Sequence, residues 1–172
     1  FDSYQSQEPL ITFTDRFSLM LGHRRIDFLS ADGHTRNHTM VWLPDDHVLF
    51  SGDNVVNQWP PMCHQGVPNH WHDTLNHIYS EIHPHVLVPG HGPVCDASFA
   101  LNVRDILSDL QYQVRDAINN GKNRDETMEE VLYPLSYEIP KWFEEHAERI
   151  KKMSIGVIFD TIQGQLGTNG ND

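Results

Sequence analysis

The chain has 172 residues, of which 38% are hydrophobic and 21% charged, and this size and composition are typical of one folded domain rather than of a disordered segment. The formal net charge is −12, from 24 acidic and 12 basic side chains. This charge argues against a nucleic-acid partner bound through phosphates and against an anionic membrane surface. No apolar run approaches the ~18 residues that a transmembrane helix needs.

Histidine is abundant, with 12 residues in the chain, several of them between His64 and His91. This excess favours metal binding, although surface imidazoles account for part of it. Cys63 and Cys95 fit neither a Cys-x-x-Cys pattern nor a disulfide framework, which is typical of a reducing compartment. The spacing does not decide whether either thiol lies near a site. We therefore expect a cytoplasmic protein, and the start at Phe1 leaves a removed N-terminal signal as the alternative.

The first third of the chain predicts strands. Residues 1–9 are polar and predict a flexible arm or linker. Apolar residues then alternate with polar ones on both sides of a short turn at Asp15-Arg16, which predicts a strand hairpin. The alternating residues are Ile11, Phe13, Phe17, Leu19 and Leu21. A third strand is expected over residues 26–29 and leads into a loop around His34.

A second hairpin is expected directly after that loop. The apolar runs 40–43 and 48–50 flank Pro44-Asp45-Asp46-His47. Proline presets φ and aspartate side chains bond the local backbone, so this stretch predicts a tight turn. The hairpin would return the chain to the edge from which it left, and it would place His34 and Asp53 at that same edge of the sheet.

The rest of the chain predicts mainly helices. In order, we expect an irregular loop over residues 54–68, a helix capped by Asn69 and running to Pro84, a short buried strand at 85–88, a long helix from Ala97 to Gly121, a short helix capped by Asp125, a final amphipathic helix within 139–162, and a disordered tail over 164–172. This order divides the chain into a domain at 10–123 and a helical extension at 124–163 packed on it.

Three loops carry side chains that can bind a metal. His34 lies in Ala-Asp-Gly-His-Thr, Asp53 in Phe-Ser-Gly-Asp-Asn and His91 in Val-Pro-Gly-His-Gly-Pro. Each stands beside glycine at the end of an apolar run, where a strand stops and the chain turns. Two neutral imidazoles and one carboxylate suit zinc, or iron or manganese in an open site, and the carboxylate can bridge two ions.

These three motifs, in this order and with a plausible element between each pair, resemble the second half of the metallo-β-lactamase superfamily. The Gly-His-Thr-x-x-His and Pro-Gly-His-Gly forms look most similar to its glyoxalase-II-like branch. The resemblance runs from about Ile11 to the helix after His91. It implies an α/β fold that forms the C-terminal half of a four-layer αβ/βα sandwich, with a mixed sheet, flanking helices and extra C-terminal helices.

The resemblance also implies a division of labour among the three side chains. His34 would bind one ion, His91 a second, and Asp53, the candidate catalytic residue, would bridge them. A metal-bound hydroxide would be the nucleophile, as expected for a di-metal site. The implied cofactor is zinc, as two ions shared with the missing half of the fold, with iron or manganese as alternatives.

Other residues are expected to support this site. His38 and Thr35 are predicted to stabilise the His34 loop behind the metal ligands. Trp59, Met62 and His64 lie in the irregular loop after Asp53 and are predicted to line a substrate pocket, although the same loop could simply pack its own aromatic ring.

One motif of the superfamily is absent. Its remaining ligands come from an upstream His-x-His-x-Asp-His motif, whereas residues 1–33 contain only His23. The stretch His70-Trp71-His72-Asp73 echoes that motif but is typical of a helix start and lacks the final histidine. A lone half would expose an apolar sheet face bearing Trp42, Leu43 and Phe50, so we expect a polypeptide that carries the N-terminal half of the fold to cover it.

The favoured function is a metal-dependent hydrolase that cleaves an ester, thioester, lactone or related bond of a small molecule and is active only when complemented by the N-terminal half. The pair could also form a homo-oligomer. Two alternatives stay open, a mono-iron oxygenase of the same fold and a non-catalytic half-domain that acts as a binding partner.

Overall fold

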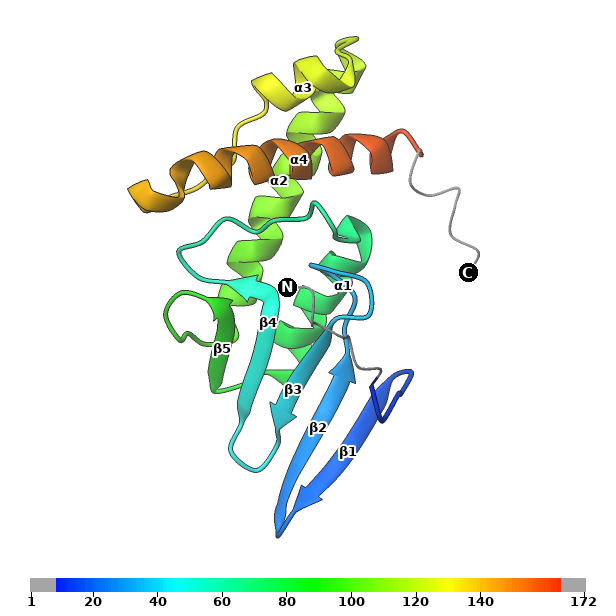
Figure 1. Ribbon diagram of the computed structural model, residues 1–172, viewed down its shortest axis with the longest axis vertical. Helices are drawn as coiled ribbons and strands as arrows, with labels where there is room; N and C mark the ends of the chain where they lie inside the picture. Colours follow the sequence, from blue (N-terminus) through cyan, green and yellow to red (C-terminus); the bar gives the residue numbers. More distant parts are fainter. Residues whose placement is uncertain (1–8, 165–172) are drawn as a thin grey trace, which may run out of the picture.

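A computed structural model describes residues 9–164 (Figure 1). The expectations for an arm at 1–9 and a tail at 164–172 fall almost entirely outside the described residues. A five-stranded mixed sheet has the order β1-β2-β3-β4-β5, in which β1 to β4 are antiparallel neighbours and β5 is parallel to β4. The strands are β1 (Arg16–Leu21), β2 (Arg24–Ser30), β3 (Thr39–Leu43), β4 (Val48–Val56) and β5 (Val86–His91).

Helical elements make up most of the remainder. They are α1 (Pro68–His77), a π-helical turn (Ile78–Ile82), α2 (Phe99–Asn119), α3 (Arg124–Glu130), the 3₁₀ turn η2 (Lys141–Phe143) and α4 (Glu144–Ile162). Figure 1 shows α2 rising beyond the sheet and α4 crossing it there, close to α3. The expected mixed sheet with flanking helices and extra C-terminal helices is confirmed. No helix in the described range 9–164 is long and apolar enough to cross a membrane.

The hairpin around the ligand loops forms as the sequence predicts. β3 and β4 pair with Leu43 opposite Val48, and the backbone N–H of Asp46 donates to the Leu43 carbonyl over 3.2 Å. His47 closes the turn with a φ of 53°. The turn geometry therefore carries the chain back to the edge from which it left.

The strand expected at Ile11 and Phe13 is wrong. Residues 11–13 form no strand, and the hairpin instead joins β1 to β2 around Gly22-His23. The Phe13 ring packs on Phe17, with centroids 6.4 Å apart, so this apolar residue lies against β1 instead of pairing beside it.

Two expected helix caps are also wrong. α1 begins at Pro68 rather than after Asn69, since proline is well suited to the first helical turn, where its missing N–H costs no hydrogen bond. α3 is capped by Asn123 rather than Asp125. The Asn123 side chain accepts from the Glu126 backbone, and the Glu126 carboxylate accepts from the Asn123 N–H. This reciprocal capping box satisfies two N–H groups at once.

The final helix is shorter than expected. Pro140 precedes the separate turn η2, and α4 begins only at Glu144. Trp142, which lies within the range 139–162 expected to form one amphipathic helix, is 79% exposed, whereas Ile150 and Ile158 on α4 are buried.

One face of the sheet packs against helices. The core combines residues of β3, β4 and β5 with α1, α2 and α4, and its fully buried members include Met40, Leu49, Leu87, Trp71, Leu75, Leu107, Leu110 and Ile158. Both α1 and α2 contact β4. Burial of this face is the main favourable term in the folding of the chain.

The opposite face carries an apolar row. The strand registers align Phe17, Phe28, Val41, Phe50 and Val88 across all five strands, and Phe50 is 42% exposed. We call these five residues the open row. The expectation that Trp42 belongs to this face is wrong. Trp42 packs against the helix-covered core because it lies one residue from Val41, and neighbouring strand residues point to opposite faces.

Candidate metal centre

The structure brings together the three side chains from the three glycine-flanked motifs, although the expectation that a strand stops at Asp53 is wrong, since β4 continues to Val56. His34 follows β2, Asp53 lies on β4, and His91 ends β5. The His34 Nε2 atom lies 3.6 Å from Asp53 Oδ2, and the His91 Nε2 atom lies 3.6 Å from Asp53 Oδ1. Each imidazole therefore faces a different oxygen of one carboxylate.

Both distances are too long for a direct hydrogen bond, since a nitrogen and an oxygen 3.6 Å apart exceed the usual hydrogen-bond length. Two ligands of one tetrahedral zinc ion lie roughly 3.3 Å apart, given bond lengths near 2.0–2.1 Å. Gly90 makes the arrangement sterically possible, because a Cβ atom there would overlap the Asp53 carboxylate.

Asn54 holds the His34 loop in place. Its Oδ1 accepts from the His34 backbone N–H at 2.8 Å, and its Nδ2 donates to the Ala31 carbonyl at 2.8 Å. The buried indole of Trp71 donates to the Asn54 carbonyl at 2.9 Å. Gly33 permits this close packing, since a Cβ there would overlap the Asn54 side chain. Sequence reasoning missed both Asn54 and Trp71.

His38 and Thr35, the two residues expected to support the His34 loop, make different contacts. The His38 Nε2 atom lies 3.0 Å from the Ser51 carbonyl, two residues before Asp53, so His38 links the loop to β4. The Thr35 carbonyl accepts from the Gly33 N–H at 3.2 Å, but within residues 9–164 the Thr35 side chain forms no hydrogen bond.

A small pocket opens around Asp53. It is lined by His34, Asp53, Val56, Trp59, Pro60, Met62 and His91. Trp59 and Met62 are among the lining residues, and their contact with a substrate stays a prediction. His64 does not line the pocket, and its ring instead meets the His34 ring edge-on, with centroids 6.4 Å apart.

Burial favours the neutral form of His34 and of the neighbouring His64. It lowers the pKa of His34, with the Asp53 carboxylate opposing the shift and the Met62 backbone a smaller opposing influence. Burial, and then His146, lower the pKa of His64. Neutral imidazole is the form that binds a metal. The Nδ1 atoms of His34 and His64 are buried and form no hydrogen bond within the described residues.

The three side chains make only part of a metal site. Across residues 9–164, no group of three or more His, Cys, Asp or Glu side chains could hold a metal ion. The physical reason is that His34 and His91 face opposite oxygens of Asp53, so each position has two donors. Zinc takes four ligands, of which at least three come from protein in a catalytic site. The donor types fit zinc, and their number does not complete a site.

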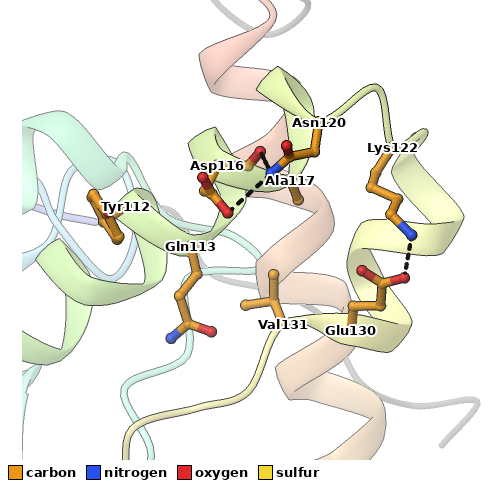
Figure 2. Close-up of a pocket in the computed structure, with 8 residues that line it drawn as sticks. All are labelled: Tyr112, Gln113, Asp116, Ala117, Asn120, Lys122, Glu130 and Val131. Atoms are coloured by element: carbon orange, nitrogen blue, oxygen red, sulfur yellow. Dashed lines mark hydrogen bonds and ion pairs between the residues drawn. The ribbon is translucent and has the colours of Figure 1, made fainter.

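A second pocket lies between α2 and α3 (Figure 2). Its polar groups pair with one another. Lys122 Nζ lies 2.6 Å from Glu130 Oε1, and the Asn120 amide donates to Asp116 Oδ2 at 3.2 Å. None of its residues lines the pocket around Asp53, so it does not compete as the chemical site.

Both cysteines are free thiols, and neither lines the pocket around Asp53. Burial raises the pKa of Cys63 to about 12 and that of Cys95 to about 11. The Cys63 backbone N–H donates to the Ser154 hydroxyl at 3.0 Å, which ties the loop after β4 to α4. The thiols are therefore protonated at neutral pH, and Cys63 has a packing role.

Comparisons with known proteins agree with this picture over part of the chain. No family model matches. Over 108 residues the chain is 28% identical to a metallo-beta-lactamase type 2 from Bacillus cereus, covering 59% of this chain and 41% of that protein. Over 60 residues it is 35% identical to a hydroxyacylglutathione hydrolase from Rhodobacter capsulatus, covering 35% of this chain and 23% of that protein. The chain spans less than half the length of these curated relatives.

Solved structures show the same fold. A metallo-beta-lactamase from Pontibacter korlensis superposes with a TM-score of 0.55 at 22% identity, over 60% of this chain and 50% of that one. A double mutant of the sec-alkyl sulfatase PisA1 gives a TM-score of 0.63 at 14% identity, over 92% of this chain and 27% of that one. Because this match covers 92% of the chain, it must include part of the segment after residue 123.

The fold is thus the metallo-β-lactamase fold, represented by one mixed sheet and its flanking helices. Fold and sequence relatives together support a relationship of the matched part of the chain to the metallo-β-lactamase superfamily. The resemblance drawn from the three glycine-flanked motifs is confirmed.

Proposed function

We propose that this chain contributes half of the active site of a metal-dependent hydrolase that cleaves an ester, thioester, lactone or related bond in a small molecule. The observation that carries the proposal is the pairing of one imidazole with each oxygen of Asp53. The curated relatives support it, since they include a metallo-beta-lactamase and a hydroxyacylglutathione hydrolase.

We infer roles for the three side chains that are in keeping with their placement. His34 and His91 would hold separate ions, zinc in the first place and iron or manganese as alternatives, with Asp53 between them. Bound divalent ions acidify water and polarise the bond to be cleaved. Asn54 and His38 would keep His34 and β4 in place. Burial lowers the pKa of His34, so this imidazole would be ready to bind without first losing a proton.

The pocket indicates the kind of substrate. Apart from the three donors, its lining is apolar and consists of Val56, Trp59, Pro60 and Met62. A substrate with an apolar group next to the reacting bond would bury that group here. The name of the sec-alkyl sulfatase that superposes on 92% of the chain is in keeping with an alkyl group at this position.

A further half of the sandwich would complete both the fold and the site. The open row offers a ready apolar surface, and each metal position lacks ligands. We propose that a segment or partner polypeptide with the His-x-His-x-Asp-His ligands covers the open row and adds the missing donors. The assembled pair could then associate further as a homo-oligomer. The charge of −12 favours neither nucleic acid nor an anionic membrane as a partner.

The test compares Asp53→Asn with Asp73→Asn in the native, assembled protein. Asp73 is exposed on α1 and lies outside the pocket, so the control makes the same change of charge. We expect Asp53→Asn to lose bound metal and at least about 100-fold in hydrolysis, whereas Asp73→Asn keeps both.

Metal analysis and intact mass of the same sample decide between the proposal and its alternatives. Two zinc ions per assembly support the hydrolase. One iron ion would favour the oxygenase, and an assembly without stoichiometric metal would favour a binding role. Wild-type metal content and hydrolysis in Asp53→Asn would refute the proposal outright.

A further inference from the structure

A stack of three aromatic rings connects the candidate metal centre to the C-terminal helices. The Trp59 ring lies on the His91 ring with centroids 5.0 Å apart and planes 15° apart. The Phe143 ring in turn lies on Trp59, at 4.4 Å and 29°. His91 ends β5, Trp59 belongs to the loop after β4, and Phe143 ends η2. Segments far apart in the sequence therefore meet at one metal-competent side chain.

The outer end of the stack is held by a small apolar cluster. Met62, Ala147 and Ile150 are buried together, with Trp59, Ile139 and Phe143 packed around them. Further along α4, the Ser154 hydroxyl accepts the Cys63 N–H at 3.0 Å, so the helix is fixed to the loop that carries Trp59. Phe143 thus rests on a buried support rather than on a free surface turn.

His91 is the imidazole that needs such support. Its side chain is 49% exposed, and within the described residues its Nδ1 atom forms no hydrogen bond. A metal-binding histidine usually donates its second ring N–H to a protein group that fixes the ring plane. His34 differs, because burial and an edge-on contact with Trp71, at 5.7 Å, restrain its ring.

We propose that Phe143 is a positioning residue for the metal centre. It presses the Trp59 ring onto His91 and so keeps His91 Nε2 directed at Asp53. The helical extension at 124–163 then contributes to the geometry of the metal centre. The inference deepens the proposed function and rests on it where metal affinity is measured, but the ring orientation can be measured without metal.

The first experiment uses the chain without added metal and records histidine ring signals by proton–carbon NMR. Protons held over the face of an indole are shifted upfield, so the His91 signals should be upfield in the wild type. Trp59→Ala should abolish this shift and Phe143→Ala should reduce it by about half or more. Phe143→Tyr keeps the ring and should restore it.

Trp142→Ala is the matched control. Trp142 is 79% exposed and adjoins Trp59 at 6.0 Å and Phe143 at 5.5 Å, but its plane is tilted by 45° and 58° to theirs, so it extends neither face of the stack. Its removal should leave the His91 signals unchanged. Identical His91 signals in the wild type and in a folded Phe143→Ala variant would overturn the inference. If Phe143→Ala does not fold, the more conservative Phe143→Leu provides the same comparison, because it keeps apolar volume and lacks the ring.

The second experiment titrates the assembled protein with cobalt(II), whose visible spectrum reports ligand geometry. Phe143→Ala should bind about tenfold more weakly than the wild type and with an altered spectrum, while Trp142→Ala should match the wild type. Equal affinity and an equal spectrum in Phe143→Ala would overturn the inference alone. A wild type that binds no cobalt would count against the proposed function and leave the NMR result to judge the stack.

Discussion

The two faces of the sheet have opposite characters within single strands. On β4, Leu49 is fully buried beneath α1 and α2, whereas its neighbour Phe50 is 42% exposed on the open row. Both are large apolar residues, so composition does not distinguish them, and only the alternation of the strand does. Burial of the helix-covered face is the main favourable term in the folding of this chain. The open row has the composition of a core, yet its members are only partly buried and Phe50 is exposed.

The candidate metal centre is likewise complete on one side and incomplete on the other. Asp53, His34 and His91 are held by this chain's own contacts, through Asn54, Gly90 and the ring stack, yet each metal position has two donors. A metal site shared between this chain and a second half of the sandwich would have this form. The comparison of the two faces therefore leads to predictions about stability and about assembly.

Truncating a side chain on the helix-covered face should have the largest effect on the stability of the chain. Leu49→Ala removes a fully buried side chain from the centre of the core and should reduce the free energy of unfolding by about 2–5 kcal/mol. Urea denaturation of the chain measures this loss. A loss below about 1 kcal/mol would mean that the helices do not pack on β4 as described.

Asn54→Ala should cause the second-largest loss in the free energy of unfolding. It leaves the His34 N–H and the Ala31 carbonyl buried without their partner, which should cost about 2–3 kcal/mol. Asn120→Ala is the control, since Asn120 is exposed at the end of α2 and should cost less than about 0.5 kcal/mol. The same denaturation measurement applies, and equal losses in the two variants would contradict the proposed anchoring of the loop.

Asp27 gives a smaller and pH-dependent effect where the helix-covered face ends. Burial alone would raise its pKa, but hydrogen bonds from Arg16, Ser18 and Arg25 outweigh burial and lower it. A carboxylate whose pKa is lower in the folded state adds stability above its unfolded pKa of about 3.9, and that stability is lost as the pH falls through the folded value.

Asp27→Asn should therefore cost about 1 kcal/mol at pH 7, a modest value because both arginines are about half exposed and screened by water. The difference from the wild type should shrink as the pH falls below about 4. Unfolding measured between pH 7 and pH 3 tests this, and a difference that does not change with pH would show that the charge of Asp27 is not responsible.

Much of this architecture could be predicted from the sequence because local rules coincide with the fold. Proline and aspartate at residues 44–46 specify the β3–β4 turn, and the turn brings His34 and Asp53 to one edge. The glycine-flanked motifs also indicated the superfamily. These features depend on neighbours in sequence, which is the range over which pattern reasoning works.

What could not be predicted depends on contacts across the chain. Alternation places Val41 and Trp42 on opposite faces but does not say which face the helices cover. Asn123 and Asp125 are both good caps, and only Glu126 at the right offset decides between them. The ring stack joins Trp59 to Phe143 through a helix whose start the sequence misplaced, so nothing in the local pattern indicated it.

A substitution in the open row should have the smallest effect on the stability of the chain alone. It is also the most direct test of the difference between the two faces of the sheet. Phe50→Ala should change the free energy of unfolding of the chain by less than about 1 kcal/mol, since the side chain is 42% exposed. In the assembled protein the same ring would be covered, and its removal should cost about 3–5 kcal/mol as for other buried aromatic residues. Denaturation of both forms, with Leu49→Ala as the variant expected to cost the same in each, measures the difference. Equal small losses for Phe50→Ala in the two forms would mean that the second layer does not pack on this face, and the open row would then have to be explained as ordinary surface.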